Sequence, residues 1–148
     1  MFYYEEDGSV RIVIADDQKH ARQGLRALLA AELADVEIRE AADGAEADRL
    51  AAEFQPDLIL MDVRMPVLGG IAATRRIKQR QPGVKILVHS LDPCAAGEAI
   101  SAGADAFVGK CEEPATLLRV VGDLLAGSAC VPCVPIVESG GDETGTRG

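Results

Sequence analysis

The sequence predicts an α/β fold, a doubly wound parallel sheet with helices on both faces, over residues 10–127. Short apolar runs rich in branched side chains alternate along this region with longer stretches of helical apolar spacing. The connections between them are short, as in open α/β sheets. The chain has 148 residues, 48% of them hydrophobic, which suffices for one domain with its own core.

The first half of this region predicts three strands and two helices. Residues 10–15 are almost continuously apolar, which is typical of a strand buried on both faces. Apolar residues at offsets of three and four then lead to Leu33 and predict a helix with one buried face. Residues 36–40 alternate like an edge strand. Residues 45–54 predict a second helix, and 57–62 a second buried strand.

The second half continues the alternation. It predicts a helix over 71–81, strands over 84–88 and 104–108, and a last helix that begins near Pro114. Between the two strands, residues 93–102 predict a weak helix that is rich in alanine. Two interpretations of this helix stay open: it has low local stability, as moving elements do, or its alanines simply pack close to the sheet.

Outside the domain, residues 1–9 are predicted to form a flexible head and 128–148 an extended or disordered tail. The head lacks the basic region of a secretory signal, and no apolar run reaches the roughly 20 residues of a membrane span. Four cysteines are too few for a disulfide scaffold in a chain of this size. We therefore expect a cytoplasmic protein with no membrane contact.

The acidic balance, a net charge of −9, argues against a large nucleic-acid-binding face. The tail is too short for a helix-turn-helix domain, so DNA binding by this chain is not expected, and the chain is either a stand-alone domain or part of a longer protein. Cys130 and Cys133 form a CxxC motif in this tail. The prolines around them disfavour a thioredoxin-like role, and two thiolates fall short of the four ligands of a zinc site unless two chains share it.

Polar side chains gather at the carboxyl ends of the predicted strands. Asp16 and Asp17 follow the first strand, Asp62 closes the third, and Ser90 and Lys110 follow the fourth and fifth. Alone, each has an ordinary explanation, such as helix capping by an aspartate. Ligands of open parallel sheets bind beyond the carboxyl ends of the strands, and the joint placement therefore favours a functional site.

The chemistry of that site follows from its charges. Neighbouring carboxylates repel one another, which raises the pKa of at least one of them unless a cation binds. Carboxylate and carbonyl oxygens suit Mg²⁺, and His89 is isolated and is expected to pack or cap rather than to bind a metal. A carboxylate in such a site can attack a phosphoryl group, whose charge a lysine and a hydroxyl would stabilise.

Several segments together resemble the receiver (CheY-like) domain of two-component response regulators over about residues 10–127. They are Ile-Ala-Asp16-Asp17, Leu-Ile-Leu-Met-Asp62-Val-Arg-Met-Pro66, Val-His-Ser90 and Ala-Phe107-Val-Gly-Lys110. The run Ala21-Arg-Gln-Gly-Leu-Arg-Ala-Leu-Leu is most similar to receivers of the LuxR-type (NarL/FixJ) class. The resemblance implies a flavodoxin-like (βα)5 sandwich with sheet order 2-1-3-4-5.

The resemblance also implies a role for each acidic residue. Asp62 would be the phosphoacceptor. Asp17 and Asp62 would bind Mg²⁺ directly, with the backbone carbonyl of Arg64 as a third ligand and Asp16 acting mainly through a water. The protein would be a signalling module rather than a metabolic enzyme, although it would catalyse its own phosphorylation and dephosphorylation at Asp62.

The remaining implied roles concern the switch. Lys110 would pair with a phosphoryl oxygen. The Ser90 hydroxyl would move to bind the phosphoryl group, and Phe107 would rotate from outward to inward. This would change partner affinity through the face made by the fourth helix, the fifth strand and the fifth helix. The implied partners are a sensor histidine kinase or phosphotransfer protein and, on that face, a second copy of the chain.

Three departures from the family's commonest pattern affect these expectations. Leu91 stands where a small residue is frequent, and its bulk is expected to limit the inward packing of Phe107. Cys111 follows Lys110 where many receivers have proline, so we expect a trans peptide bond. Arg64 and Asp92 are expected on the solvent side of the phosphate, where they would tune phosphoryl lifetime.

Other functions fit the residues less well. An aspartyl-phosphate phosphatase would need a second acid at position 64, which is Arg. A flavin- or nucleotide-binding protein would need a phosphate loop after the first strand, where Asp16 and Asp17 supply negative charge instead. A receiver fold used as a scaffold without phosphorylation stays an alternative, although the complete set of acids, Ser90 and Lys110 argues against it.

Overall fold

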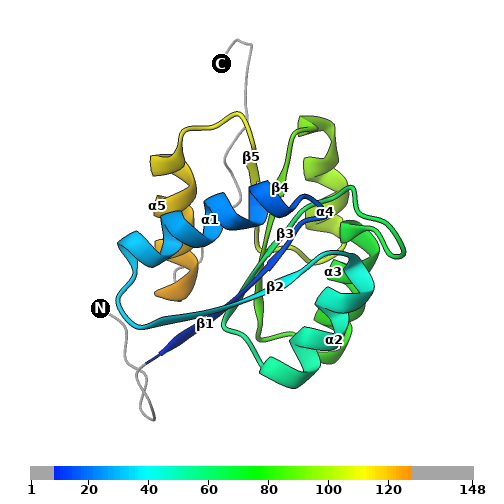
Figure 1. Cartoon of the computed structure of the whole chain (residues 1–148). Coiled ribbons are helices and arrows are strands. Elements are labelled where there is room, and N and C mark those ends of the chain that lie inside the picture. The colour runs from blue at the N-terminus through cyan, green and yellow to red at the C-terminus, as the bar shows by residue number, and fades with distance from the viewer. Residues whose placement is uncertain (1–8, 128–148) are drawn as a thin grey trace.

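The computed structural model describes residues 9–127, which contain one five-stranded parallel sheet (Figure 1). The strands are β1 (Val10–Ala15), β2 (Val36–Ala41), β3 (Leu58–Met61), β4 (Lys85–Ser90) and β5 (Ala106–Gly109). Their order is β2-β1-β3-β4-β5, and all neighbours are parallel. The predicted fold class and sheet order are therefore confirmed.

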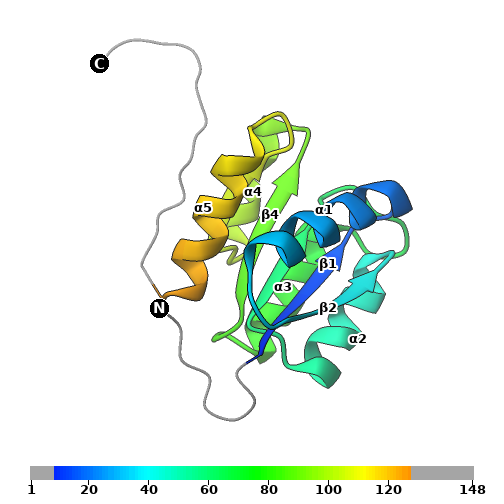
Figure 2. The same cartoon turned by 60° about the vertical axis from the view of Figure 1, so that its left-hand side comes forward.

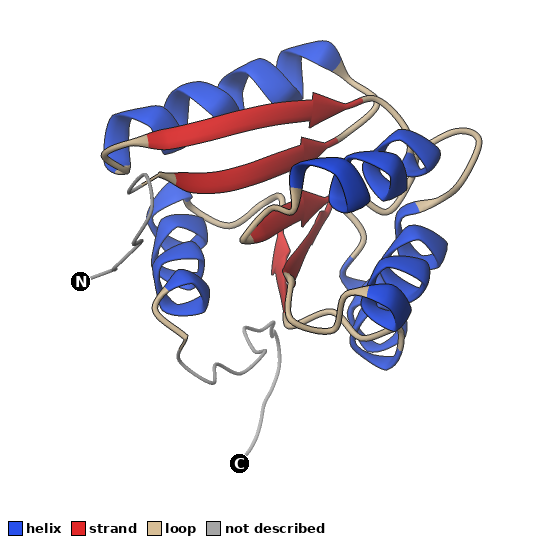
Figure 3. Cartoon of the chain, turned by 90° about the horizontal axis from the view of Figure 1, so that it is seen from below, coloured by secondary structure: helices blue, strands red, loops and turns tan. Residues whose placement is uncertain are grey.

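Four α-helices and one short 3₁₀ helix connect the strands, and a fifth α-helix follows the last strand. They are α1 (Lys19–Glu32), α2 (Gly44–Phe54), α3 (Gly70–Arg80), η1 (Pro93–Ala95), α4 (Ala96–Ser101) and α5 (Pro114–Leu125). Helices α1 and α5 cover one face of the sheet and α2, α3 and α4 the other, as Figures 1 and 2 show. Figure 3 shows the strands between these two helical layers.

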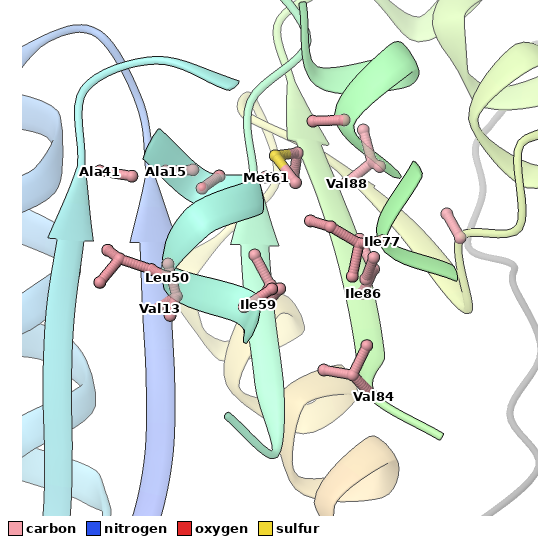
Figure 4. Packing of buried hydrophobic residues seen from close by; sticks show 14 of the residues in the cluster. Val13, Ala15, Ala41, Leu50, Ile59, Met61, Ile77, Val84, Ile86 and Val88 are labelled. Carbon is pink, nitrogen blue, oxygen red and sulfur yellow. The ribbon is translucent and has the colours of Figure 1, made fainter. Parts of the chain in front are cut away.

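The core consists of two apolar clusters, one on each face of the sheet. Because successive strand residues face opposite sides, Ile12 and Ile14 pack towards α1 and α5, whereas Val13 packs towards α2. Figure 4 shows the cluster on the face covered by α2, α3 and α4, in which Val13 and Ile86 lie with Leu50 of α2 and with residues of α3. Both faces of the central strands are buried, which explains their continuous apolar runs.

The predicted helix over 93–102 is divided in the structure. It begins with a 3₁₀ turn, η1, and continues as α4, which has only six residues. Its alanines Ala95, Ala99 and Ala102 are buried, and Ala95 and Ala99 belong to the cluster on this face. The interpretation that small side chains pack this helix close to the sheet is therefore confirmed.

The fifth strand begins later than the sequence pattern predicts. Residues 104–108 are apolar enough for a strand, but β5 starts at Ala106. Asp105 instead accepts hydrogen bonds through its carboxylate from the Ile86 backbone at 2.9 Å and from Lys78 Nζ at 3.0 Å. β5 therefore begins one residue after Asp105, whose carboxylate is bonded to the neighbouring strand and to Lys78.

The predicted head and tail, with Cys130 and Cys133, lie outside the described residues apart from Ser9. Within residues 9–127, no helix is both long and apolar enough to cross a membrane.

Candidate functional site

Three carboxylates meet where β1 and β3 end. Asp16 and Asp17 follow β1 directly, and Asp62 follows β3, its backbone N–H donating to the Ala15 carbonyl at 2.9 Å. Asp16, Asp17 and Asp62 each offer an oxygen within 4.8 Å of the others. Asp16 is buried, Asp62 is partly buried and Asp17 is exposed, so the group opens to solvent on one side. The predicted acidic cluster is present.

Lys110 supplies the positive charge of this cluster. Its Nζ donates to Asp16 Oδ2 at 2.7 Å and lies 3.5 Å from Asp62 Oδ2. Burial of the Lys110 ammonium lowers its pKa, but the hydrogen bond to Asp16 and the charge of Asp62 outweigh burial, so the pKa lies above its ordinary value. Lys110 is therefore charged at neutral pH and joins the end of β5 to the ends of β1 and β3.

Asp62 is the strained member of the cluster in electrostatic terms. Burial raises its pKa, Lys110 lowers it, and the charge of Asp16 raises it again, so the pKa of Asp62 lies above its ordinary value. One lysine thus does not compensate for the burial and mutual repulsion of these carboxylates. A site that holds an uncompensated negative charge favours a cation, which is the fit that Mg²⁺ requires.

This raised pKa predicts a pH-dependent effect of Asp62→Asn on stability. The folded-state pKa of Asp62 is above the unfolded value, so ionised Asp62 costs stability, and the loss grows as pH rises through the folded-state pKa. Without divalent cations, we expect Asp62→Asn to raise Tm by a few degrees at pH 7, about the shift from 1 kcal/mol in a domain of this size. Thermal unfolding in EDTA measures this.

The pH series provides the control for that measurement. Well below the unfolded-state pKa of 3.8, Asp62 is protonated in both the folded and the unfolded wild-type chain, so the Tm advantage of Asp62→Asn should shrink towards zero there. An equal Tm for the two proteins at pH 7, or an advantage that persists unchanged at low pH, would contradict the electrostatic interpretation.

The loop from β3 to α3 carries the residues that follow Asp62, and two glycines hold it. A Cβ at Gly70 would overlap the carbonyl oxygen of Asp62, and a Cβ at Gly44 would overlap the carbonyl oxygen of Leu68. The Gly70 N–H also donates to the Val63 carbonyl at 2.9 Å. The starts of α2 and α3 therefore contact this loop backbone to backbone, at distances that only glycine permits.

The turn within this loop is strained. The Leu68 N–H donates to the Pro66 carbonyl at 2.7 Å, which makes a three-residue turn around Val67. Val67 has a φ of 68°, a left-handed conformation that a β-branched residue rarely adopts, and its side chain is 82% exposed. The loop beside Asp62 is thus held in a conformation that its own sequence disfavours.

Ser90 ends β4 and is buried. Its hydroxyl accepts a hydrogen bond from the Asp92 N–H at 3.1 Å, and its carbonyl accepts one from the Lys110 N–H at 2.8 Å. Ser90 therefore lies beside the β5 end that carries Lys110, at the edge of the sheet where the acids lie. Its predicted movement towards a phosphoryl group stays a prediction.

Phe107 lies on β5, paired with Val88 of β4, and belongs to the cluster on the α2, α3 and α4 side. Its ring is buried while the Leu91 side chain is 70% exposed. The expectation that Leu91 limits inward packing of Phe107 is therefore wrong for this structure, because Leu91 turns towards solvent. Phe107 is already buried here, so the outward starting position that the resemblance implies for it is not observed, and a change at Phe107 on phosphorylation stays a prediction.

Two further expectations concern single residues near the site. The bond between Lys110 and Cys111 is trans, like every peptide bond of residues 9–127. His89 packs at the end of β4, and its Nδ1 is buried without a hydrogen-bond partner. Burial and the charge of Lys110 lower the His89 pKa to about 4 against the opposing effect of Asp16, so His89 is neutral at pH 7.

Comparison with known proteins agrees with this geometry. A family described as the response regulator receiver domain matches residues 12–122. The chain belongs to the response regulator receiver domain family. It is a receiver domain of the two-component response regulator type, and its relatives and structural neighbours include LuxR-type regulators.

Individual relatives place this receiver more closely. The transcriptional regulatory protein LnrK of Bacillus subtilis (strain 168) is 36% identical over 126 residues, 83% of this chain and 57% of that protein. The transcriptional regulatory protein DegU of Brevibacillus brevis is 33% identical over 84% of this chain and 54% of its own length. The receiver thus spans about half the length of these curated relatives, which are regulators rather than metabolic enzymes.

Solved structures give the same result. A LuxR-family two-component response regulator from Aurantimonas sp. SI85-9A1 is 36% identical, with a TM-score of 0.75 over 81% of this chain and 87% of that one. The signal receiver domain of the putative response regulator NarL from Mycobacterium tuberculosis is 29% identical, with a TM-score of 0.74 over 80% of this chain and 98% of that one.

Two residues that hold the site were missed by the sequence interpretation. Arg22 Nη1 donates to the carbonyl of Asp16 at 2.8 Å, and Arg22 Nε donates to Glu40 of β2, also at 2.8 Å. Arg22 belongs to the run that carries the LuxR-type resemblance, but nothing in its spacing indicates a contact with Asp16. The long-range partner Glu40 becomes visible only when β2 is placed beside β1.

Proposed function

We propose that this receiver accepts one phosphoryl group on Asp62 and uses it to change its affinity for a partner. The observation that carries the proposal is the joint placement of Asp16, Asp17, Asp62 and Lys110 at one edge of the sheet, with Lys110 within 3.5 Å of two of the acids. A phosphoryl-accepting site needs this combination of a nucleophilic carboxylate, a cation site and a fixed ammonium.

The residues divide the chemistry as follows. An oxygen of Asp62 attacks the phosphorus of a phosphohistidine, a phosphorus–oxygen bond forms, the phosphorus–nitrogen bond breaks, and the electron pair returns to the imidazole nitrogen. Lys110 lies close enough to Asp62 to pair with an oxygen of a phosphoryl group on that residue, in exchange for part of its contact with Asp16. Among the described residues, the Ser90 hydroxyl accepts a hydrogen bond from the Asp92 backbone N–H. After phosphorylation it would turn to donate to another phosphoryl oxygen.

The donor set fits Mg²⁺. Carboxylate oxygens from Asp16, Asp17 and Asp62 lie within 4.8 Å of one another, and the raised pKa of Asp62 shows that their negative charge is under-compensated. We assign the backbone carbonyl of Arg64 as the further protein ligand. When bound, Mg²⁺ would neutralise negative charge on the transferring phosphoryl oxygens.

The output would pass through the surface made by α4, β5 and α5. Ser90 ends β4 and is linked by its carbonyl to the start of the β5–α5 loop, and Phe107 lies on β5 in the cluster that includes Ala95 and Ala99. A movement of Ser90 towards the phosphoryl group would therefore change how β5 packs against η1 and α4. The partners in this proposal are a sensor histidine kinase or phosphotransfer protein as donor and a second copy of this chain on the output surface.

The test is phosphorylation of the wild-type chain with a small phosphodonor. After incubation with acetyl phosphate and Mg²⁺, intact-protein mass spectrometry should show addition of one phosphoryl group, and EDTA should prevent it. No addition under conditions where the protein is folded would favour the alternative, a scaffold that acts without phosphorylation. Sedimentation of the chain with and without beryllofluoride then tests for the homodimer.

Arg64 and Asp92 lie across from each other on the loops that flank this site. Their side chains approach to 4.0 Å, and both are exposed, at 80% and 43%. An ion pair this open adds little stability. We expect it instead to restrict the access of water to the phosphoryl group, so Arg64→Ala and Asp92→Ala should each accelerate loss of the phosphoryl group several-fold.

The measurement is the decay of phosphorylated protein after removal of the donor. Arg49→Ala is the matched control, because Arg49 is also exposed and ion-paired but lies on α2 with Glu46 and Glu53. Dephosphorylation rates that are unchanged in both Arg64→Ala and Asp92→Ala would exclude this role.

A further inference from the structure

We propose that Arg22 is a positioning residue that holds the Asp16–Asp17 peptide segment in the geometry needed to bind Mg²⁺. The proposal rests on the proposed function, because it gives that site a supporting group outside its ligands. Arg22 lies on the first turn of α1, yet its guanidinium reaches back to the backbone of Asp16.

The contacts of Asp16 show how the segment is held. Its Oδ2 accepts from Lys110 at 2.7 Å, its Oδ1 accepts from the Gln18 N–H at 2.9 Å, and its carbonyl accepts from Arg22 Nη1 at 2.8 Å. Asp17 has no such contact on its carboxylate among the described residues, and its orientation therefore depends on the peptide that joins it to Asp16. Among the described residues, Arg22 is the one whose side chain donates a hydrogen bond to the carbonyl of this peptide.

Arg22 is itself held from the far side. Glu40 on β2 accepts from Arg22 Nε at 2.8 Å through one carboxylate oxygen and from Arg26 Nε at 2.7 Å through the other. Hydrogen bonds from Arg26 and Arg22 lower the Glu40 pKa, so this carboxylate stays charged at neutral pH. The Arg22 side chain is only 15% exposed, whereas that of Arg26 is 45% exposed. The guanidinium therefore has both its edges occupied and little freedom to leave Asp16.

Charge alone predicts the opposite effect from positioning. A guanidinium beside an acidic cluster repels a divalent cation, so removing Arg22 should strengthen Mg²⁺ binding if only electrostatics operated. If Arg22 fixes the ligands, removing it should weaken binding, because a group that orients metal ligands from outside their shell typically changes affinity by about 10–100-fold. The direction in which Mg²⁺ affinity changes when Arg22 is removed therefore separates a positioning role from a purely electrostatic effect.

The experiment is a Mg²⁺ titration of the whole chain followed by NMR, with Arg22→Met, Arg22→Lys and Arg26→Met beside the wild type. We expect Arg22→Met to weaken Mg²⁺ binding about tenfold. Arg22→Lys keeps the charge but cannot make both guanidinium contacts, so it should restore binding only in part. Arg26→Met is the matched control: it removes the other partner of Glu40, makes no contact with Asp16, and should bind Mg²⁺ like the wild type.

A second measurement needs no metal. The Gln18 amide donates to Asp16 Oδ1, and its hydrogen exchange reports how firmly this segment is held. Without Mg²⁺, exchange at Gln18 should be faster in Arg22→Met and unchanged in Arg26→Met.

The outcomes separate this proposal from the proposed function. Wild-type chain that binds no Mg²⁺ and takes up no phosphoryl group would overturn the proposed function. Wild-type binding with equal or tighter binding in Arg22→Met, or with unchanged Gln18 exchange, would overturn the role of Arg22 alone. A lower Tm for Arg22→Met with unaltered Mg²⁺ affinity of the folded protein would also overturn it, because that is the result of a purely structural contact.

Discussion

Replacing Asp62 by Asn is expected to reduce labelling by acetyl phosphate to background, because the neutral amide lacks the nucleophilic carboxylate oxygen. The replacement is nearly isosteric. The Asn side-chain oxygen can still accept the hydrogen bond that Asp62 Oδ1 accepts from the Val63 N–H at 2.9 Å. Loss of labelling would therefore reflect the missing nucleophile and not a rearranged loop. Intact-protein mass after incubation with donor and Mg²⁺ measures it.

The control for this prediction is Asp35→Asn. Asp35 is exposed, lies between α1 and β2, and has a φ of 53°, a conformation that Asn adopts readily. Its labelling should equal that of the wild type. Equal labelling of Asp62→Asn would move the acceptor to Asp16 or Asp17. The Tm of Asp62→Asn is measured beside its labelling, and loss of labelling in a variant that is folded at the labelling temperature cannot be ascribed to unfolding.

The fold was predictable because its signal is repeated and local. The buried strands are apolar runs, and β2 at the edge of the sheet alternates apolar and charged residues, so each strand carries a pattern that is recognised locally. The edges of the elements were less predictable: the polar contact of Asp105 with Lys78 and the Ile86 backbone delays β5, and it depends on residues far apart in the sequence. Local patterns cannot anticipate a contact of that kind.

The acidic cluster was predictable for a related reason. Residues that follow parallel strands share one edge of the sheet, so Asp16, Asp62 and Lys110 could be brought together once the resemblance supplied the strand order. The buried position of Phe107 beside an exposed Leu91 could not, because side-chain direction at a strand end depends on the loop that follows. Residue size alone gave the wrong expectation there.

The supports of the site were the least predictable part. Val67 occupies a left-handed turn for which glycine would be the expected residue, and its identity gives no sign of this conformation. Arg22 and Glu40 look like ordinary surface charges in the sequence, yet they join α1, β2 and the backbone of Asp16. Both features depend on close packing of segments that only the folded chain brings together.

Gly70→Ala is expected to disrupt the phosphoacceptor loop. An alanine Cβ would overlap the carbonyl oxygen of Asp62 and lie 3.0 Å from Val63 Cα, and both neighbours are backbone, which cannot rotate away as a side chain can. The loop must therefore move, and this movement strains the hydrogen bond that the Gly70 N–H donates to the Val63 carbonyl. We expect a loss of about 1–3 kcal/mol in the free energy of unfolding, as for other overpacked sites, and at least tenfold slower labelling.

Gly24→Ala is the matched control, since Gly24 is an exposed position of α1 and a Cβ there meets no atom within 4 Å. It should gain roughly 0.5–1 kcal/mol, because alanine is the better helix residue, and should label normally. Urea unfolding gives the stabilities, and labelling is measured at a temperature where circular dichroism shows Gly70→Ala to be folded. Labelling of folded Gly70→Ala at the wild-type rate would mean that the Asp62 peptide tolerates displacement, and that the close approach of α3 serves packing rather than the site.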